Sequence, residues 1–130
     1  MSTPQTEESS VVALLNAFAA ADLPANASSP KLEASHFVLS GAGYLLSFVV
    51  SNTNASAQFI QFFDQTQAPG SGAVPRVVFT VAGSSDRVVS YPLPGRLFYA
   101  GIWVANSSTS ATLTAGSADC FFDVQYLPAY

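Results

Sequence analysis

Side chains that could perform acid–base, nucleophilic or metal chemistry are few and scattered in this sequence. Acyl transfer needs a nucleophile beside a base and an orienting acid, but the single histidine is His36 and no Gly-x-Ser-x-Gly sequence occurs. A zinc site takes about four His, Cys or carboxylate ligands, which one histidine and one distant cysteine do not supply. Glycine-rich phosphate-binding sequences are also absent. The sequence therefore predicts no enzyme activity, no cofactor and no metal site.

The carboxylates do not form a catalytic pair by spacing. Asp119 and Asp123 are four residues apart, which places them on one side of a strand at a separation of roughly 13 Å. That separation is too large for the paired carboxylates of a glycoside hydrolase. Asp64 follows a predicted strand and Asp86 lies in a predicted turn, where aspartate commonly caps the backbone. No acidic cluster indicates a calcium site.

Cys120 is the only cysteine, so an intramolecular disulfide is excluded. It precedes Phe121 and Phe122 in a segment that is typical of a strand. We predict a buried thiol without a chemical role, which is compatible with folding in a reducing cytosol.

Low charge is the strongest compositional signal. The chain has 130 residues, enough for one domain with a core, but only 9% of them are charged, against roughly 25% in a typical soluble domain. Four basic residues against eight acidic ones cannot neutralise a nucleic-acid backbone. No apolar run is long enough to span a membrane. Because interface cores are depleted in charge, the composition favours a protein that packs against other subunits.

Residues 1–30 differ from the rest and predict an N-terminal arm with a short apolar helix. Thr3 and Pro4 suit a helix start, and the alanine- and leucine-rich segment that follows favours helix until Pro24. Residues 26–30 are small and predict a linker. Two glutamates occupy the place of the basic region of a signal peptide, so we expect none. An isolated helix of this length is marginal, so we expect it to dock through Val11, Val12, Leu14, Leu15 and Phe18.

Residues 31–130 predict an all-β domain. Short apolar or alternating segments are separated by turn signals every 8 to 12 residues, which is typical of a sandwich or barrel. The count of about seven to eight strands fits a jelly-roll-like antiparallel β-sandwich. A weak edge strand around Leu113 is also expected, and the sixth and seventh segments could be one strand bent at Gly101. The predicted strands are residues 36–39, 44–50, 57–64, 76–82, 87–91, 96–100, 101–105 and 120–126.

The order of turns and aromatic residues between residues 35 and 127 resembles that of small β-rich virion proteins of tailed bacteriophages. The pattern begins with Phe62-Phe63-Asp64 and continues through Ala68-Pro69-Gly70 to Pro75 and an alternating strand. It then runs from Pro94-Gly95-Arg96 through an aromatic pair and Gly101 into an aliphatic strand and a Ser/Thr run. Among such proteins are capsid decoration, or cement, proteins with jelly-roll folds.

The resemblance implies a non-enzymatic protein that binds the outside of an assembled phage head and stabilises contacts between capsomers. Its expected partners are the major capsid protein and further copies of itself, as a homotrimer or homodimer. It would be made in the host cytoplasm and located on the capsid exterior, without contact to nucleic acid or membrane. Besides the arm, we expect interface residues in two loops, namely Pro69, Pro75, Pro94 and Arg96.

Two other functions remain open at this point. A receptor- or carbohydrate-binding module of a head fibre or tail would need an exposed aromatic platform, although most aromatic candidates lie in apolar strands typical of a core. A secreted structural protein would need the signal peptide that the sequence does not predict. The aromatic candidates are Tyr44, Tyr91, Tyr99, Trp103 and Tyr126.

Overall fold

The computed structural model of this chain describes residues 23–129, and these residues form nine strands joined by loops and turns. No helix with the length and apolarity needed to cross a bilayer occurs among them. The arm helix predicted within residues 1–22 lies outside the described residues. In chain order the strands are β1 (Ala25–Ser28), β2 (Ser35–Ser40), β3 (Gly43–Asn52), β4 (Gln58–Phe63), β5 (Val77–Val81), β6 (Ser85–Ser90), β7 (Arg96–Phe98), β8 (Gly101–Ser107) and β9 (Cys120–Pro128).

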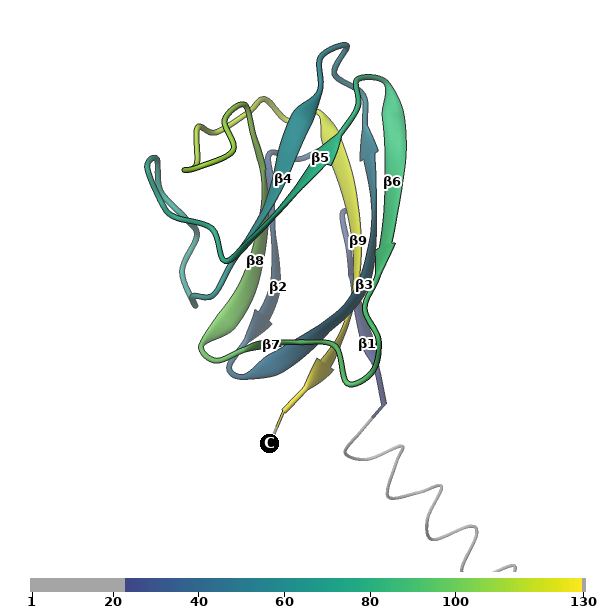
Figure 1. The fold of residues 1–130 in the computed structure, drawn as a ribbon, viewed down its shortest axis with the longest axis vertical. Helices are drawn as coiled ribbons and strands as arrows, with labels where there is room; N and C mark the ends of the chain where they lie inside the picture. The colour runs from purple at the N-terminus through teal and green to yellow at the C-terminus, as the bar shows by residue number, and fades with distance from the viewer. Residues whose placement is uncertain (1–22, 130) are drawn as a thin grey trace, which may run out of the picture.

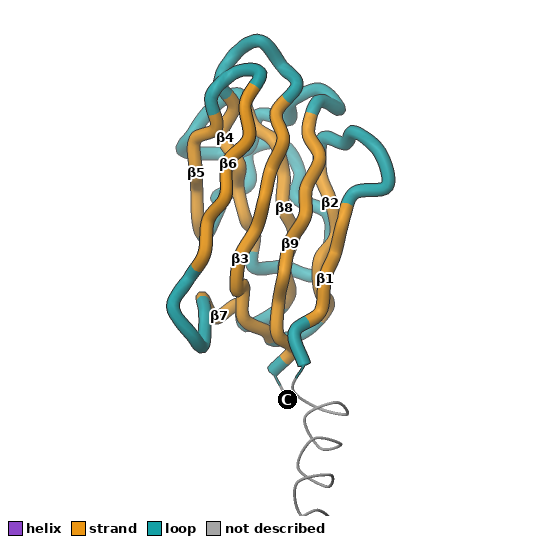
Figure 2. Tube along the Cα trace, turned by 90° about the vertical axis from the view of Figure 1, so that its right-hand side faces the viewer, coloured by secondary structure: helices purple, strands orange, loops and turns teal. Residues whose placement is uncertain are grey.

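The strands form two antiparallel sheets that pack face to face (Figure 1). Sheet A has the order β1-β9-β3-β6, with the short β7 beside β3, and β1, β9, β3 and β6 lie side by side in Figure 2. Sheet B has the order β2-β8-β4-β5. Strands that follow one another in the chain therefore occupy corresponding places in the two sheets: β1 with β2, β3 with β4, β5 with β6, and β8 with β9. This is the jelly-roll arrangement of two interleaved Greek keys, and the predicted all-β sandwich is confirmed.

Alternation along each strand builds the core. In β9, Cys120, Phe122 and Val124 are buried while the residues between them are exposed, as expected when successive side chains point to opposite faces. Strand β3 contributes Leu45, Phe48 and Val50 in the same way, with its phase adjusted by an irregularity between Leu45 and Ser47.

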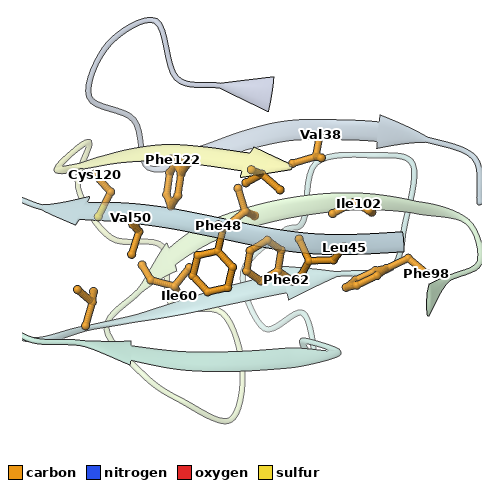
Figure 3. Close-up of a cluster of buried hydrophobic side chains, with 13 residues drawn as sticks. Val38, Leu45, Phe48, Val50, Ile60, Phe62, Phe98, Ile102, Cys120 and Phe122 are labelled. Carbon is orange, nitrogen blue, oxygen red and sulfur yellow. The ribbon is translucent and has the colours of Figure 1, made fainter. Parts of the chain in front are cut away.

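Aromatic side chains from both sheets meet in the middle of this core (Figure 3). The Phe48 ring of sheet A lies 4.9 Å from the Phe62 ring and 5.0 Å from the Phe79 ring of sheet B, measured between centroids. Such tilted and edge-on pairs are favourable beyond their buried area. The two sheets are therefore held together by large apolar side chains.

Three details of the strand prediction are wrong. Residues 26–30 are no linker, because Ala25–Ser28 forms β1 and pairs with β9. The segments on either side of Gly101 are not one bent strand, because β7 pairs with β3 in sheet A and β8 with β4 in sheet B. Leu113 lies in no strand; it is buried in a loop against Phe63 and Ala105 on the outer side of sheet B.

Candidate functional site

The described residues hold few groups suited to acid–base or metal chemistry. His36 in β2 forms a local pair with Glu33, which lies just before that strand. The distance between His36 Nδ1 and Glu33 Oε2 is 2.8 Å. Asp119 accepts a hydrogen bond from the Asn54 amide, and Asp123 accepts one from the Ser28 hydroxyl. No group of three or more His, Cys, Asp or Glu side chains within residues 23–129 is arranged to hold a metal ion.

Cys120 is fully buried in the core, as predicted. Burial raises the pKa of its thiol to about 11, and the charge of the neighbouring Asp119 acts in the same direction. Because the thiolate is the reactive form of cysteine, the thiol is unreactive in the folded protein near neutral pH.

Asp64, directly after β4, holds the connection between β7 and β8. Its Oδ1 atom accepts the Ala100 N–H at 2.7 Å, and its Oδ2 atom accepts the Tyr99 N–H at 3.0 Å. Partial burial would by itself raise the pKa of this carboxyl, but the backbone N–H groups of residues 99–101 and the Arg76 charge outweigh burial and lower the pKa. Predicted as a turn-forming residue at the end of its own strand, Asp64 instead binds backbone N–H groups that lie 35 residues away in the chain.

Arg76 ties the β4–β5 loop to the same connection. Its Nε atom donates a hydrogen bond to the Leu97 carbonyl oxygen at 3.1 Å. Its guanidinium carbon lies 5.6 Å from the centroid of the Phe98 ring and 5.4 Å from that of Tyr99, within the range of cation–π attraction. Asp64 and Arg76 therefore fix two loops that the sequence analysis treated separately.

The connection between β7 and β8 belongs to one end of the sandwich, which we call the base: residues 23–24, 41–42, 91–101 and 128–129, at the bottom of Figure 1. Three large apolar side chains are exposed there, with exposed fractions of 84% for Leu93, 67% for Tyr99 and 55% for Leu23. In the part of the chain that is described, the loops of the opposite end, residues 53–57, 82–84 and 108–119, expose no large apolar side chain. The apolar surface of the two ends is thus unequal.

The predicted interface residues divide between two places. Pro94 and Arg96 are exposed at the base, whereas Pro69 and Pro75 are half-buried in the β4–β5 loop. Part of that loop runs along the outer side of sheet B, where Gly72 and Ala73 exchange backbone hydrogen bonds with Leu113. Val11, Val12, Leu14, Leu15 and Phe18 lie outside the described residues.

The five aromatic candidates do not form a shared platform. Tyr91 and Tyr126 pack against the core, and burial raises the pKa of the Tyr91 hydroxyl despite the opposing charge of Arg96. Tyr44 and Trp103 are half-buried, and the Trp103 indole N–H donates to the Thr66 carbonyl oxygen at 3.2 Å. Of the five, only Tyr99 is exposed.

Phe121, which was not among the predicted site residues, lies on the outer face of sheet A with 44% of its surface exposed. A signal was available: Cys120, Phe122 and Val124 share one phase of the alternation, so the ring at position 121 must point to the opposite face. Phe121 borders an open depression of about 520 Å³ near the end opposite the base.

Comparisons with protein-family models, curated protein sequences and solved structures found no match to this chain.

Proposed function

We propose that this chain is a structural virion protein that decorates an assembled phage head and stabilises contacts between its capsomers. The observation that carries the proposal is the unequal surface of the sandwich, with Leu23, Leu93 and Tyr99 exposed at one end only among the described residues. Large exposed apolar side chains at one end of a domain are a feature of protein–protein contact surfaces. The base would therefore face the major capsid protein.

Chain connectivity supports the same orientation. Residues 1–22 precede Leu23 and so join the domain at the base, and their sequence contains the apolar run from Val11 to Phe18. A docking surface composed of this run and the base loops would be continuous along the chain. The low content of charged residues, 9%, limits the desolvation cost of such an interface.

The mechanism of stabilisation is mass action. A protein that binds the assembled shell and not its dissociated subunits shifts the equilibrium towards the shell. The free energy of this shift grows with the ratio of the protein's concentration to its Kd. No chemical step is required. On this proposal the protein is made in the host cytoplasm and ends on the capsid exterior, with the major capsid protein and copies of itself as partners.

The test is binding to heads assembled without this protein, measured by co-sedimentation. Deletion of residues 1–22, which stops short of β1, should abolish binding while circular dichroism still reports the β-sandwich. The double variant Leu93→Ser/Tyr99→Ser should weaken binding at least about tenfold. Val88→Ser is the matched control, because Val88 is also 67% exposed but lies on the outer face of sheet A. Equal binding by all variants would refute the assignment of the base.

The oligomeric state provides a separate test. Light scattering over a dilution series should give a trimer or dimer, since decoration proteins of this kind act at symmetry axes and closed oligomers are symmetric. A monomer at every concentration would instead favour the alternative of a receptor-binding module of a head fibre or tail.

A further inference from the structure

The depression beside Phe121 lies where three strands of sheet A meet the loops opposite the base. Register pairing places Asp86 of β6 beside Ser51 of β3, and Ser51 beside Phe121 of β9. These three residues form one row across the outer face, because the residues that follow or precede them, such as Val50 and Phe122, are buried in the core. The depression is lined by this row and by Thr53, Ser84 and Ser85.

Hydrogen bonds from a buried side chain connect the loops around the depression. Asn52, which is 2% exposed, donates its side-chain amide to the carbonyl oxygens of Ser56 and Ala82, both at 3.1 Å. It thereby joins the β3–β4 loop to the β5–β6 turn. Within that turn Ser84 adopts a φ of 49°, in the left-handed region that non-glycine residues rarely adopt.

The same face offers three kinds of contact in a small area. The half-exposed Phe121 ring is an apolar surface, and Ser51 and Thr53 beside it carry hydroxyl groups. Asp86 adds an exposed carboxylate, which has no cationic partner because the one ion pair within residues 23–129 joins His36 and Glu33. No lysine or arginine lines the depression. The arrangement thus suits a neutral ligand that has both an apolar face and hydroxyl groups.

We propose that this depression binds a neutral saccharide. The Phe121 ring packs against the C–H face of one pyranose ring, and the Asp86 carboxylate accepts hydrogen bonds from the sugar hydroxyls. Neighbouring strands are about 4.8 Å apart, so Asp86 and Phe121 are separated by about 10 Å at their Cα atoms, a distance that one sugar residue bridges. Anionic sugars are excluded because the only charge that lines the depression is negative. The site is distinct from the base and does not depend on the proposed capsid contact.

The test is a ¹H–¹⁵N NMR titration of the full chain with methyl glycosides of glucose, galactose, mannose and N-acetylglucosamine, and with 3′-sialyllactose as the anionic probe. An open depression predicts weak binding, with Kd on the order of 1 mM for at least one neutral glycoside. The shifts should map to residues 51–53, 84–86 and 121. Phe121→Ala should abolish them, and Asp86→Asn should raise Kd about tenfold through loss of a charged acceptor.

Phe37→Ala is the matched control, because Phe37 is an equally exposed phenylalanine, 44%, on the outer face of sheet B. It should leave Kd unchanged. Urea denaturation of each variant separates loss of the site from loss of the fold. The proposal is overturned if no neutral glycoside shifts these resonances at about ten times the expected Kd, if 3′-sialyllactose binds more tightly than every neutral probe, or if Phe37→Ala and Phe121→Ala have equal effects.

Discussion

Replacing Asp64 by asparagine should destabilise the sandwich through a connection that lies far away in the chain. The carboxylate accepts the Ala100 N–H at 2.7 Å and the Tyr99 N–H at 3.0 Å. Asparagine keeps one acceptor oxygen but loses the charge and presents an NH₂ group to the second donor. Hydrogen bonds to a charged group contribute about 1.5–3 kcal/mol each, and neutral ones about 1 kcal/mol. Because Asp64 is only partly buried, solvent screening reduces the net loss to about 1–2 kcal/mol.

The difference in stability between wild type and Asp64→Asn should depend on pH, in a direction set by the shifted pKa of Asp64. The folded-state pKa of Asp64 lies below its ordinary value of 3.8, so the stabilisation by the carboxylate is complete above that value and is lost as pH falls through the lower folded pKa. Asp64→Asn has no carboxyl to titrate at this position. The difference in unfolding free energy between wild type and variant should therefore be constant above about pH 5 and shrink below pH 3.8.

Urea denaturation followed by fluorescence of Trp103, the only tryptophan, measures both effects. Asp86→Asn is the control, because its exposed carboxylate has no ion-pair partner among the described residues, and it should change stability by less than about 0.5 kcal/mol. The reasoning fails if Asp64→Asn costs no more than this control. It also fails if the Asp64→Asn deficit is as large well below pH 3.8 as at pH 7.

Three further outcomes test the packing. In urea denaturation, Phe122→Ala should lower the free energy of unfolding by about 3–5 kcal/mol and Phe121→Ala by less than about 1 kcal/mol. Equal losses would contradict the assignment of Phe122 to the core face of β9 and Phe121 to the outer face. Gly95→Ala should lower Tm, because φ is 99° and a Cβ would lie 2.6 Å from a β3 carbonyl oxygen. A Cβ at position 70 would meet nothing within 4 Å, so Gly70→Ala should leave Tm unchanged or slightly raised. An equal fall in Tm for both variants would contradict the steric argument. The Cys120 thiol should react with Ellman's reagent only when the protein unfolds, given its burial and pKa of about 11; rapid reaction of the native protein at pH 8 would show an accessible thiolate.

The long strands could be predicted from the sequence because their signal is local. The run from Tyr44 to Val50 is apolar apart from Ser47, and Val77, Phe79 and Val81 alternate with their neighbours; both segments are strands in the structure. Turn residues between them bounded each strand to within a few positions. A count of strands and turns was then enough to indicate a sandwich.

Elements without such a pattern were missed. Strand β1 has the sequence Ala-Asn-Ala-Ser, which has low strand propensity, and it is extended because β9 offers a complete row of backbone partners. Leu113 was taken for a strand residue, yet it is buried because the loop that carries it folds over the outer face of sheet B. There the buried Gln61 amide donates to the carbonyl oxygens of Thr109 and Ser110. No local pattern encodes either contact.

The sequence by itself determined that residues 31–130 form an all-β domain and that the chain is poor in charge, because alternation, turn residues and composition act over a few neighbouring positions. Only the tertiary structure decided the pairing of β1 with β9, the separation of β7 from β8 into different sheets, and the anchoring of residues 99–101 by Asp64. It also brought Asp86, Ser51 and Phe121 into one row. The physical reason is that strand order and sheet register depend on contacts between distant segments, and these contacts form only when the two sheets close over their shared core.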